Sequence, residues 1–385
     1  MKIIRHEKSP VLGLATLAVA VAAVAAGILA GAGNAAPTTV VGKALWLQNA
    51  PGLQKKSEQF KQPTLENGLL TVKGTNAADR IALRLRAGQP GILEVDVGDD
   101  GSAEFSFERT EIAQIVVDAG NGGDAVRIDE SNGVFADTIP TTIDGGNGND
   151  RLVGGSGAGT LIGGNGDDAL FGGNGNEMLL GGNGNDSIDG NKGNDVAFMG
   201  NGNDTFVWDP GDGSDTVEGQ KGTDTMVFNG ASIAEKVDLS ANGHRLRFVR
   251  DIANITMDTD GVEQVDFNAL GGTDVVTVND LTGTDVKQFN VDLAGSPGGT
   301  TGDGAADSVI VNGTDGNDKI KVNGDAGGVK VKGLVPTVNV FHAEVAFDSP
   351  VDSLEINTLA GTDTVHSGGL ADGVIQLLVD PVGKP

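Results

Sequence analysis

Residues 145–207 read GGNGNDRLV GGSGAGTLI GGNGDDALF GGNGNEMLL GGNGNDSID GNKGNDVAF MGNGNDTFV, which is seven consecutive nonapeptides. Each copy follows the form G-G-x-G-x-D-x-U-x, where U is a large apolar residue, and the period holds without a gap. The sixth position of successive copies is Asp150, Gly159, Asp168, Glu177, Asp186, Asp195 and Asp204. A fixed period of this kind is typical of repeat architectures, in which each unit stacks on its neighbours.

The letters of one repeat predict a turn followed by a very short strand. Gly and Asn tolerate positive φ at little cost, so the first five positions favour a tight turn. The D-x-U-x tail alternates polar and apolar residues, as a strand with one inward side chain does. Stacked copies would bury the U residues in a thin, continuous core. The turns would then align carbonyl and carboxylate oxygens along the edges, and oxygen-rich sites suit Ca²⁺ rather than zinc.

Electrostatics favours a bound cation over an empty ladder of carboxylates. Carboxylates stacked about 5 Å apart repel by roughly 3 kcal/mol per pair at an effective dielectric constant of about 20. The alternative is a calcium-free solenoid with solvated Asp-Gly turns, which would leave this repulsion uncompensated.

The segment resembles the RTX, or haemolysin-type, calcium-binding repeat. The resemblance implies an all-β fold, a right-handed parallel β-roll with two nonapeptides per coil, and several Ca²⁺ ions between the turns of neighbouring coils. Two further nonapeptides, at 210–218 and 219–227, follow a two-residue displacement at Trp208-Asp209. The metal ligands implied by the resemblance are the carboxylates of Asp150, Asp168, Asp186, Asp204, Asp224, Asp195 and Asp215, with the turn residues Gly146, Gly148, Gly164, Gly166, Gly182 and Gly184.

Two nonapeptides per coil place alternate repeats on the same edge of the roll. One edge then carries an uninterrupted series of Asp residues from Asp150 to Asp224. The other edge carries Gly159, which has no carboxylate, followed by Glu177, Asp195 and a displaced Asp215. We therefore expect three or four calcium sites on the first edge and one or two weaker sites on the second.

The flanks of the array resemble one another. LLTVKGTNAADRIAL (69–83) matches SVIVNGTDGNDKIKV (308–322), and the intervals Asp79–Asp124 and Asp318–Asp363 are both 45 residues. The 50-residue interval from Asp224 to Asp274 indicates a third copy. The predicted organisation is one β-solenoid with longer-runged β modules on both sides of the roll. Its parts are an N-terminal module (69–144), the roll (145–227), a second module (228–294), a flexible loop (295–307) and a C-terminal module (308–385) with a last strand at 374–379.

The N-terminus predicts export. Residues 1–36 have the basic start, apolar stretch and small-residue cleavage site of a signal peptide, although an uncleaved membrane anchor is the alternative. Residues 37–68 are predicted to be a spacer with one short strand near 44–47. We expect no membrane span after signal cleavage. The chain has no Cys, so calcium would take the stabilising role that disulfides have in other exported proteins.

The amino-acid composition limits the classes of partner that the protein can bind. The net charge is −27, with 53 acidic residues, which disfavours nucleic acid and anionic membranes and favours cations. Within residues 145–207, eight acidic residues face only Arg151 and Lys192, so the array itself carries −6.

No catalytic motif emerges from the sequence. His6, His244, His342 and His366 do not form H-E-x-x-H, and no Ser lies in G-x-S-x-G. The expected function is therefore a secreted, non-enzymatic calcium-binding protein with a structural or adhesive role, whose partner would be a cell-surface or extracellular glycan or protein. The alternative is a solenoid lyase or epimerase on extracellular polysaccharide, with its catalytic groups in the basic cluster His244-Arg245-Leu246-Arg247 and Arg250. That cluster is more typical of a solvated strand face that offsets the acidic charge of the protein.

Overall fold

The computed structural model describes residues 60–345 and 351–380. The signal peptide predicted for 1–36 and the strand predicted near 44–47 lie outside these residues. The described part of the predicted spacer already contains β1 (Thr64–Glu66), which pairs antiparallel with β2 (Leu69–Lys73). Asn67 and Gly68 both adopt positive φ (51° and 82°) and make a two-residue hairpin turn. This hairpin therefore begins inside the predicted spacer, five residues before the N-terminal module that the sequence places at 69–144.

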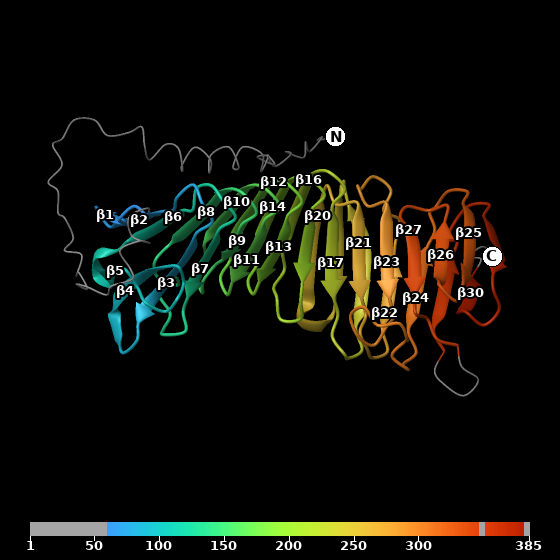
Figure 1. Ribbon diagram of the computed structural model, residues 1–385. Helices are drawn as coiled ribbons and strands as arrows, with labels where there is room; N and C mark the ends of the chain where they lie inside the picture. The colour runs from blue at the N-terminus through green and yellow to red at the C-terminus, as the bar shows by residue number, and fades with distance from the viewer. Residues whose placement is uncertain (1–59, 346–350, 381–385) are drawn as a thin grey trace, which may run out of the picture. The chain divides into compact units, whose positions relative to one another are not determined.

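Two fifteen-stranded sheets contain the strands of the described residues (Figure 1). The first sheet has the order β1, β2, β6 (Gln114–Asp118), β8 (Thr141–Asn147), β10 (Thr160–Asn165), β12 (Met178–Asn183), β14 (Val196–Asn201), β16 (Thr216–Lys221), β20 (Ile255–Asp260), β19 (Arg245–Arg250), β18 (Lys236–Asn242), β22 (Val275–Val278), β24 (Ser308–Asn312), β28 (Ser353–Asn357) and β30 (Gln376–Asp380).

The second sheet has the order β29 (Thr364–Leu370), β25 (Lys319–Asp325), β26 (Gly328–Lys332), β27 (Thr337–Phe341), β23 (Gln288–Asp292), β21 (Gln264–Asn268), β17 (Thr225–Asn229), β15 (Thr205–Trp208), β13 (Ser187–Asn191), β11 (Ala169–Gly173), β9 (Arg151–Val153), β7 (Ala125–Asp129), β3 (Arg80–Arg86), β4 (Gln89–Val97) and β5 (Phe105–Glu108). Two short 3₁₀ turns, η1 (Arg109–Glu111) and η2 (Ile252–Asn254), interrupt the strands. No helix among the described residues is long and apolar enough to cross a membrane.

In the array the chain alternates between the two sheets, and each sheet gains one parallel strand per coil. Leu161 of β10 pairs with Leu179 of β12, and Leu170 of β11 pairs with Ile188 of β13. The partners are two nonapeptides apart, so two repeats make one coil. The predicted all-β parallel roll is confirmed.

The U residues form the core that the repeat predicts. Leu152, Leu170 and Ile188 are fully buried from one sheet, as are Leu179 and Ala197 from the other. Most strands of the array contribute one inward apolar side chain, whereas β14, β15 and β17 contribute two, and stacking along the sheets joins these side chains into one continuous cluster.

The two-residue insertion at Trp208-Asp209 is absorbed without breaking this stack. The Trp208 ring is buried and lies parallel to the Phe228 ring, with 4.0 Å between centroids and 3° between planes. Its Nε1–H donates to the Gly213 carbonyl at 2.8 Å, which holds the enlarged turn against the ring. The insertion therefore enlarges the turn between β15 and β16, and the parallel pairing of the strands continues past it.

Each of the three related modules inserts an antiparallel meander into an otherwise parallel sheet. The meanders are β3–β4–β5, β18–β19–β20 and β25–β26–β27. These added hairpins account for the longer rungs. Residues 295–307 contain no named strand and only an isolated bridge between Ala294 and Gly302, and the last strand lies at 376–380, close to its predicted position.

The two 45-residue intervals each correspond to one coil. Asp79 N–H donates to Asp124, and Asp318 N–H donates to Asp363. The third interval was wrong: Asp224 N–H donates to Glu263, whereas Asp274 accepts from Glu235 N–H. The strands that follow Asp224 and Asp274 belong to different sheets, because the β18–β19 hairpin shifts the spacing in the second module.

Candidate metal-binding site

We call the turns that lead from the first sheet into the second sheet the first edge. Its sixth-position carboxylates form a hydrogen-bonded ladder from coil to coil. Asp168 Oδ1 accepts the backbone N–H of Asp150, and Asp186 Oδ1 accepts that of Asp168, both at 2.8 Å. The same contact continues to Asp204 and Asp224. The structure thus brings together all five predicted Asp ligands of this edge.

The second carboxylate oxygen of each of these residues is buried and has no hydrogen-bond donor among the described residues. The residues are at most 2% exposed, and the unpartnered atoms are the Oδ2 atoms of Asp150, Asp168, Asp186, Asp204 and Asp224. A buried charged oxygen without a partner is costly, so it calls for a cation or a proton.

The first glycine of a repeat has no side chain and lies close against this oxygen, and we call the position that its missing Cβ would occupy the gap. A Cβ built on Gly163 would collide with Asp168 Oδ2 and with the carbonyl oxygen of Gly181 in the next coil. Carboxylate and carbonyl oxygens therefore converge on the space that the absent side chain leaves. Equivalent gaps occur at Gly145, Gly181 and Gly219, whereas Met199 occupies this position in the seventh repeat. Such a set of hard oxygens fits Ca²⁺.

The predicted turn glycines shape these turns. Gly146, Gly148, Gly164, Gly166, Gly182 and Gly184 all have φ between 93° and 134°, a region that disfavours side chains. A Cβ on Gly164 would also collide with the Gly146 carbonyl of the preceding coil. Glycine is therefore required both for the turn and for the close stacking that presents backbone oxygens to the site.

Burial makes these carboxylates hard to ionise without a cation. It raises the pKa of Asp168 to about 7 and the pKa of Asp186 and Asp224 to about 6, although the hydrogen bond from the preceding coil opposes the shift. Burial likewise raises the pKa of Asp150 and Asp204. Near neutral pH a proton and a metal ion would compete for the same oxygens.

The second edge comprises the turns that lead into the first sheet, and its ladder is shorter. Asp195 Oδ1 accepts Glu177 N–H at 2.6 Å, and Asp215 Oδ1 accepts Asp195 N–H at 2.8 Å. The insertion at Trp208 therefore does not displace Asp215, contrary to the sequence-based expectation. Burial raises the pKa of Asp195 to about 8, and Asp195 Oδ2 has no donor among the described residues.

On the second edge, the hydrogen-bonded series of carboxylates does not continue to the turns that precede Glu177. Glu177 Oε2 accepts Gly173 N–H in its own turn at 2.9 Å, and Glu177 Oε1 is buried without a donor. The preceding turn has Gly159 in the ladder position. In this region the carboxylate of Glu130 accepts hydrogen bonds from the N–H and O–H groups of Ser156, at 2.8 and 3.0 Å. The two edges are therefore chemically unequal.

The ladder continues beyond the array, at a turn whose carboxylate the sequence analysis did not include among the metal ligands. Asp124 Oδ1 accepts Asp79 N–H, and Asp124 Oδ2 is buried without a donor, as in the repeats. Its turn reads AGNGGDAVR at 119–127, a nonapeptide that begins with Ala119 instead of glycine. The Gly-x-Gly-x-Asp spacing of this turn was the available signal.

Other ladder carboxylates have internal partners. Asp79 Oδ2 accepts the N–H and O–H groups of Thr75, at 2.6 and 2.9 Å. Glu235 on the second edge pairs with the buried guanidinium of Arg250. These positions therefore require no metal ion.

The basic cluster of the enzyme hypothesis is engaged by carboxylates. Arg245 pairs with Asp258 at 2.5 Å and with Glu218 at 2.9 Å, and His244 Nδ1 lies 2.9 Å from Asp260. Arg250 is buried and also lies over the Trp208 ring. Arg247 is exposed, so the structure does not bring the four residues together around one groove.

No three carboxylate or histidine side chains converge on one point among the described residues. This agrees with a site built from one carboxylate per turn and several backbone oxygens.

The profile of the RTX calcium-binding nonapeptide repeat matches this chain in four copies, over residues 144–176, 171–206 and 211–230. No curated protein matches the sequence. The chain therefore carries RTX calcium-binding repeats, and the resemblance seen in the sequence is confirmed over the roll.

Proposed function

We propose that this chain is a secreted protein whose roll binds several Ca²⁺ ions and which acts outside the cell as a structural or adhesive component, without catalysis. One observation carries the proposal. Consecutive buried carboxylate oxygens on the first edge have no donor in the part of the chain that the structure describes, and they lie beside the gaps at Gly145, Gly163 and Gly181. Asp150, Asp168 and Asp186, with the turn carbonyls, would hold the ions there.

The bound ion supplies positive charge that neutralises the ladder and links one coil to the next. Residues 145–207 carry eight acidic residues against two basic ones and contain many glycines, which are entropically costly to order. On the first edge the four gaps predict three or four sites, with weaker sites at Gly172 and Gly190 on the second edge. Folding of the roll would then depend on calcium.

Export of the chain from the cell is consistent with calcium-dependent folding of the roll. Calcium modules that work outside cells bind with Kd values of about 10⁻⁴ to 10⁻³ M, so the roll would fold only after it meets extracellular calcium. RTX repeats are typical of secreted proteins, and the charge of −27 would oppose aggregation of the unfolded chain.

Calorimetric titration of the secreted chain with Ca²⁺ tests the proposal, because it measures the affinity and the number of ions together. We expect several ions per chain and a parallel gain of β signal in far-ultraviolet circular dichroism. The matched control is Asp79→Asn, which removes a ladder charge whose Oδ2 already has two donors. It should bind as many ions as the wild type. A spectrum identical in chelator and in millimolar calcium would refute calcium-dependent folding.

A separate assay tests the absence of catalysis. The chain is incubated with uronate polymers in calcium, and unsaturated products are measured by their ultraviolet absorbance. Product formation above a heat-treated control would assign the lyase activity instead, and a change of uronate stereochemistry would assign an epimerase.

A further inference from the structure

Four exposed lysines lie on the outer face of two neighbouring strands in the C-terminal module. Lys319 and Lys321 alternate with buried Ile320 and Val322 in β25, and Lys330 and Lys332 alternate with buried residues in β26. The chain as a whole carries a net charge of −27. This concentration of positive charge therefore contrasts with the rest of the protein, and we call it the lysine face.

The strand register places these charges against one another. Lys321 pairs with Lys332 across the antiparallel β25–β26 ladder, and with exposed His366 across the parallel β25–β29 ladder. Like charges directly opposite each other destabilise a sheet. No ion pair joins the four lysines to carboxylates of the described residues, whereas Lys73 pairs with Asp118 at 3.5 Å. The fold thus keeps an unfavourable arrangement that its own carboxylates do not relieve.

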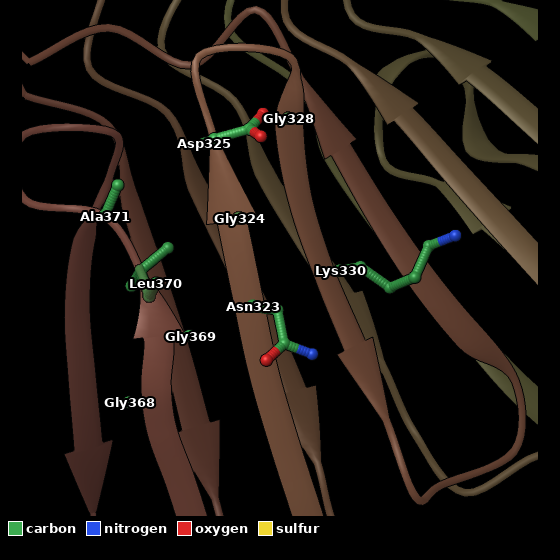
Figure 2. Close-up of a pocket in the computed structure, with 9 residues that line it drawn as sticks. All are labelled: Asn323, Gly324, Asp325, Gly328, Lys330, Gly368, Gly369, Leu370 and Ala371. Carbon is green, nitrogen blue, oxygen red and sulfur yellow. The ribbon is translucent and has the colours of Figure 1, made fainter.

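A shallow depression of about 590 Å³ adjoins the lysine face (Figure 2). Asn323 and Lys330 line it together with Gly368 and Gly369 of β29. A Cβ at Gly368 would meet no atom within 4 Å, so the peptide backbone is bare there. In Figure 2 the Lys330 ammonium points away from Asp325, the one carboxylate that lines the depression. The surface offers cations beside amide and peptide hydrogen-bonding groups.

We propose that this face, formed by β25, β26 and β29, binds a linear polysaccharide that carries carboxylate groups. The lysine ammonium groups would pair with the carboxylates, while Asn323 and the bare peptides would bond sugar hydroxyls. The inference rests on the proposed function in one respect, since it names the extracellular partner of an adhesive protein.

Charge density favours this partner over nucleic acid. Double-stranded DNA carries one charge per about 1.7 Å, whereas a polysaccharide with at most one carboxylate per sugar has a lower charge density, so the acidic remainder of this protein would repel DNA more strongly. Recognition of nucleic acids also relies on arginine and on aromatic stacking. Among the described residues, β25, β26 and β29 contain no arginine, Phe or Trp.

The test compares two triple variants of the full secreted chain in millimolar calcium. Lys321→Gln, Lys330→Gln and Lys332→Gln together remove charge from the lysine face. Lys61→Gln, Lys73→Gln and Lys236→Gln remove the same charge from exposed positions elsewhere. Binding to polygalacturonate is measured at low and high salt, with neutral dextran and double-stranded DNA as comparison polymers.

We expect the first triple to weaken polygalacturonate binding by about tenfold or more, because three ammonium groups that attract the anionic polymer are lost. The second triple should change it by less than about twofold, and high salt should weaken the wild type. The first triple should also be at least as stable as the wild type, since its opposed charges are gone.

Equal losses in both triples, no binding by the wild type, or binding to DNA alone would each overturn the inference. Calcium titration of the same samples separates the two proposals. A chain that binds calcium but no polymer refutes only the lysine face, whereas a chain that binds polymer but no calcium refutes only the proposed function.

Discussion

Replacement of Asp186 by Asn should have opposite effects with and without calcium. The variant keeps an oxygen that can accept Asp168 N–H, but it removes the charge beside the gap at Gly181. In calcium the variant loses a ligand and should be less stable than the wild type. In chelator above pH 6 it should be more ordered, because burial raises the pKa of Asp186 to about 6 and the wild-type fold must then hold a buried charge.

The loss in calcium follows from the expected affinity. For Kd values of about 10⁻⁴ to 10⁻³ M, a site in about 10 mM calcium stabilises the fold by about 1.4 to 2.7 kcal/mol. Asp186→Asn should lose that amount for the site that it serves. The matched variant Glu177→Gln on the second edge should lose less, because Glu177 already bonds Gly173 in its own turn and the preceding turn has Gly159 in place of a carboxylate. Alanine at the two positions should show the same ranking.

The assay is denaturant unfolding in calcium, followed by far-ultraviolet circular dichroism, together with calcium titration of the β signal from chelator. Asp186→Asn should need more calcium to fold, and its starting signal in chelator should equal or exceed that of the wild type. Equal losses for the two variants would show that the edges share the ions evenly. If Asp186→Asn were less ordered than the wild type in chelator, this would refute the argument that the buried carboxylate without an ion destabilises the fold.

Further outcomes follow from the same geometry. Without calcium the fold should lose stability as pH rises from about 4 through about 7, since the raised pKa values of Asp168 and Asp186 make the folded state bind protons more tightly; unfolding at a series of pH values measures this. Gly163→Ala should cost about 1–3 kcal/mol in calcium by filling the gap, whereas Gly91→Ala, which meets open space, should be neutral in the same unfolding assay. Chelator should speed hydrogen exchange in 145–227 before it does so in 308–345. Sequencing of secreted material should find a new N-terminus near Ala36, and an intact Met1 would contradict it.

The roll could be predicted from sequence because its structure is local and periodic. The U column gave the buried residues, and the sixth position gave carboxylates such as Asp150 and Asp186 that meet from coil to coil. Two repeats per coil, implied by the RTX resemblance, also gave the inequality of the edges, since Gly159 falls in one ladder only.

Features that depend on pairing between distant segments could not be predicted from the sequence. The 50-residue interval from Asp224 to Asp274 joined two turns that enter different sheets, because no periodic signal reveals the β18–β19 hairpin. The same hairpin brings Arg250 to Glu235. The opposition of Lys321 and Lys332 likewise depends on strand register, which single-residue patterns do not fix.

The ladder carboxylates fall into two groups, according to whether the second oxygen of the carboxylate has a hydrogen-bond donor or cationic partner within the protein. The two groups largely distinguish the roll from the flanking modules. In the modules Thr75 and Thr314 donate to Asp79 and Asp318, and Arg250 neutralises Glu235, so these turns carry their own partners. In the roll no such donor is present among the described residues, and glycine keeps a gap open instead. Asp124 and Asp274 test the distinction, because the Oδ2 atom of each has no donor among the described residues and burial raises their pKa values to about 6 and about 8. The first position of each of these turns is alanine, Ala119 and Ala269. Without the gap, a proton fits these oxygens better than an ion. We therefore expect calcium dependence to be confined to the roll, and we expect the flanking turns that pair with its ends to form before calcium binds.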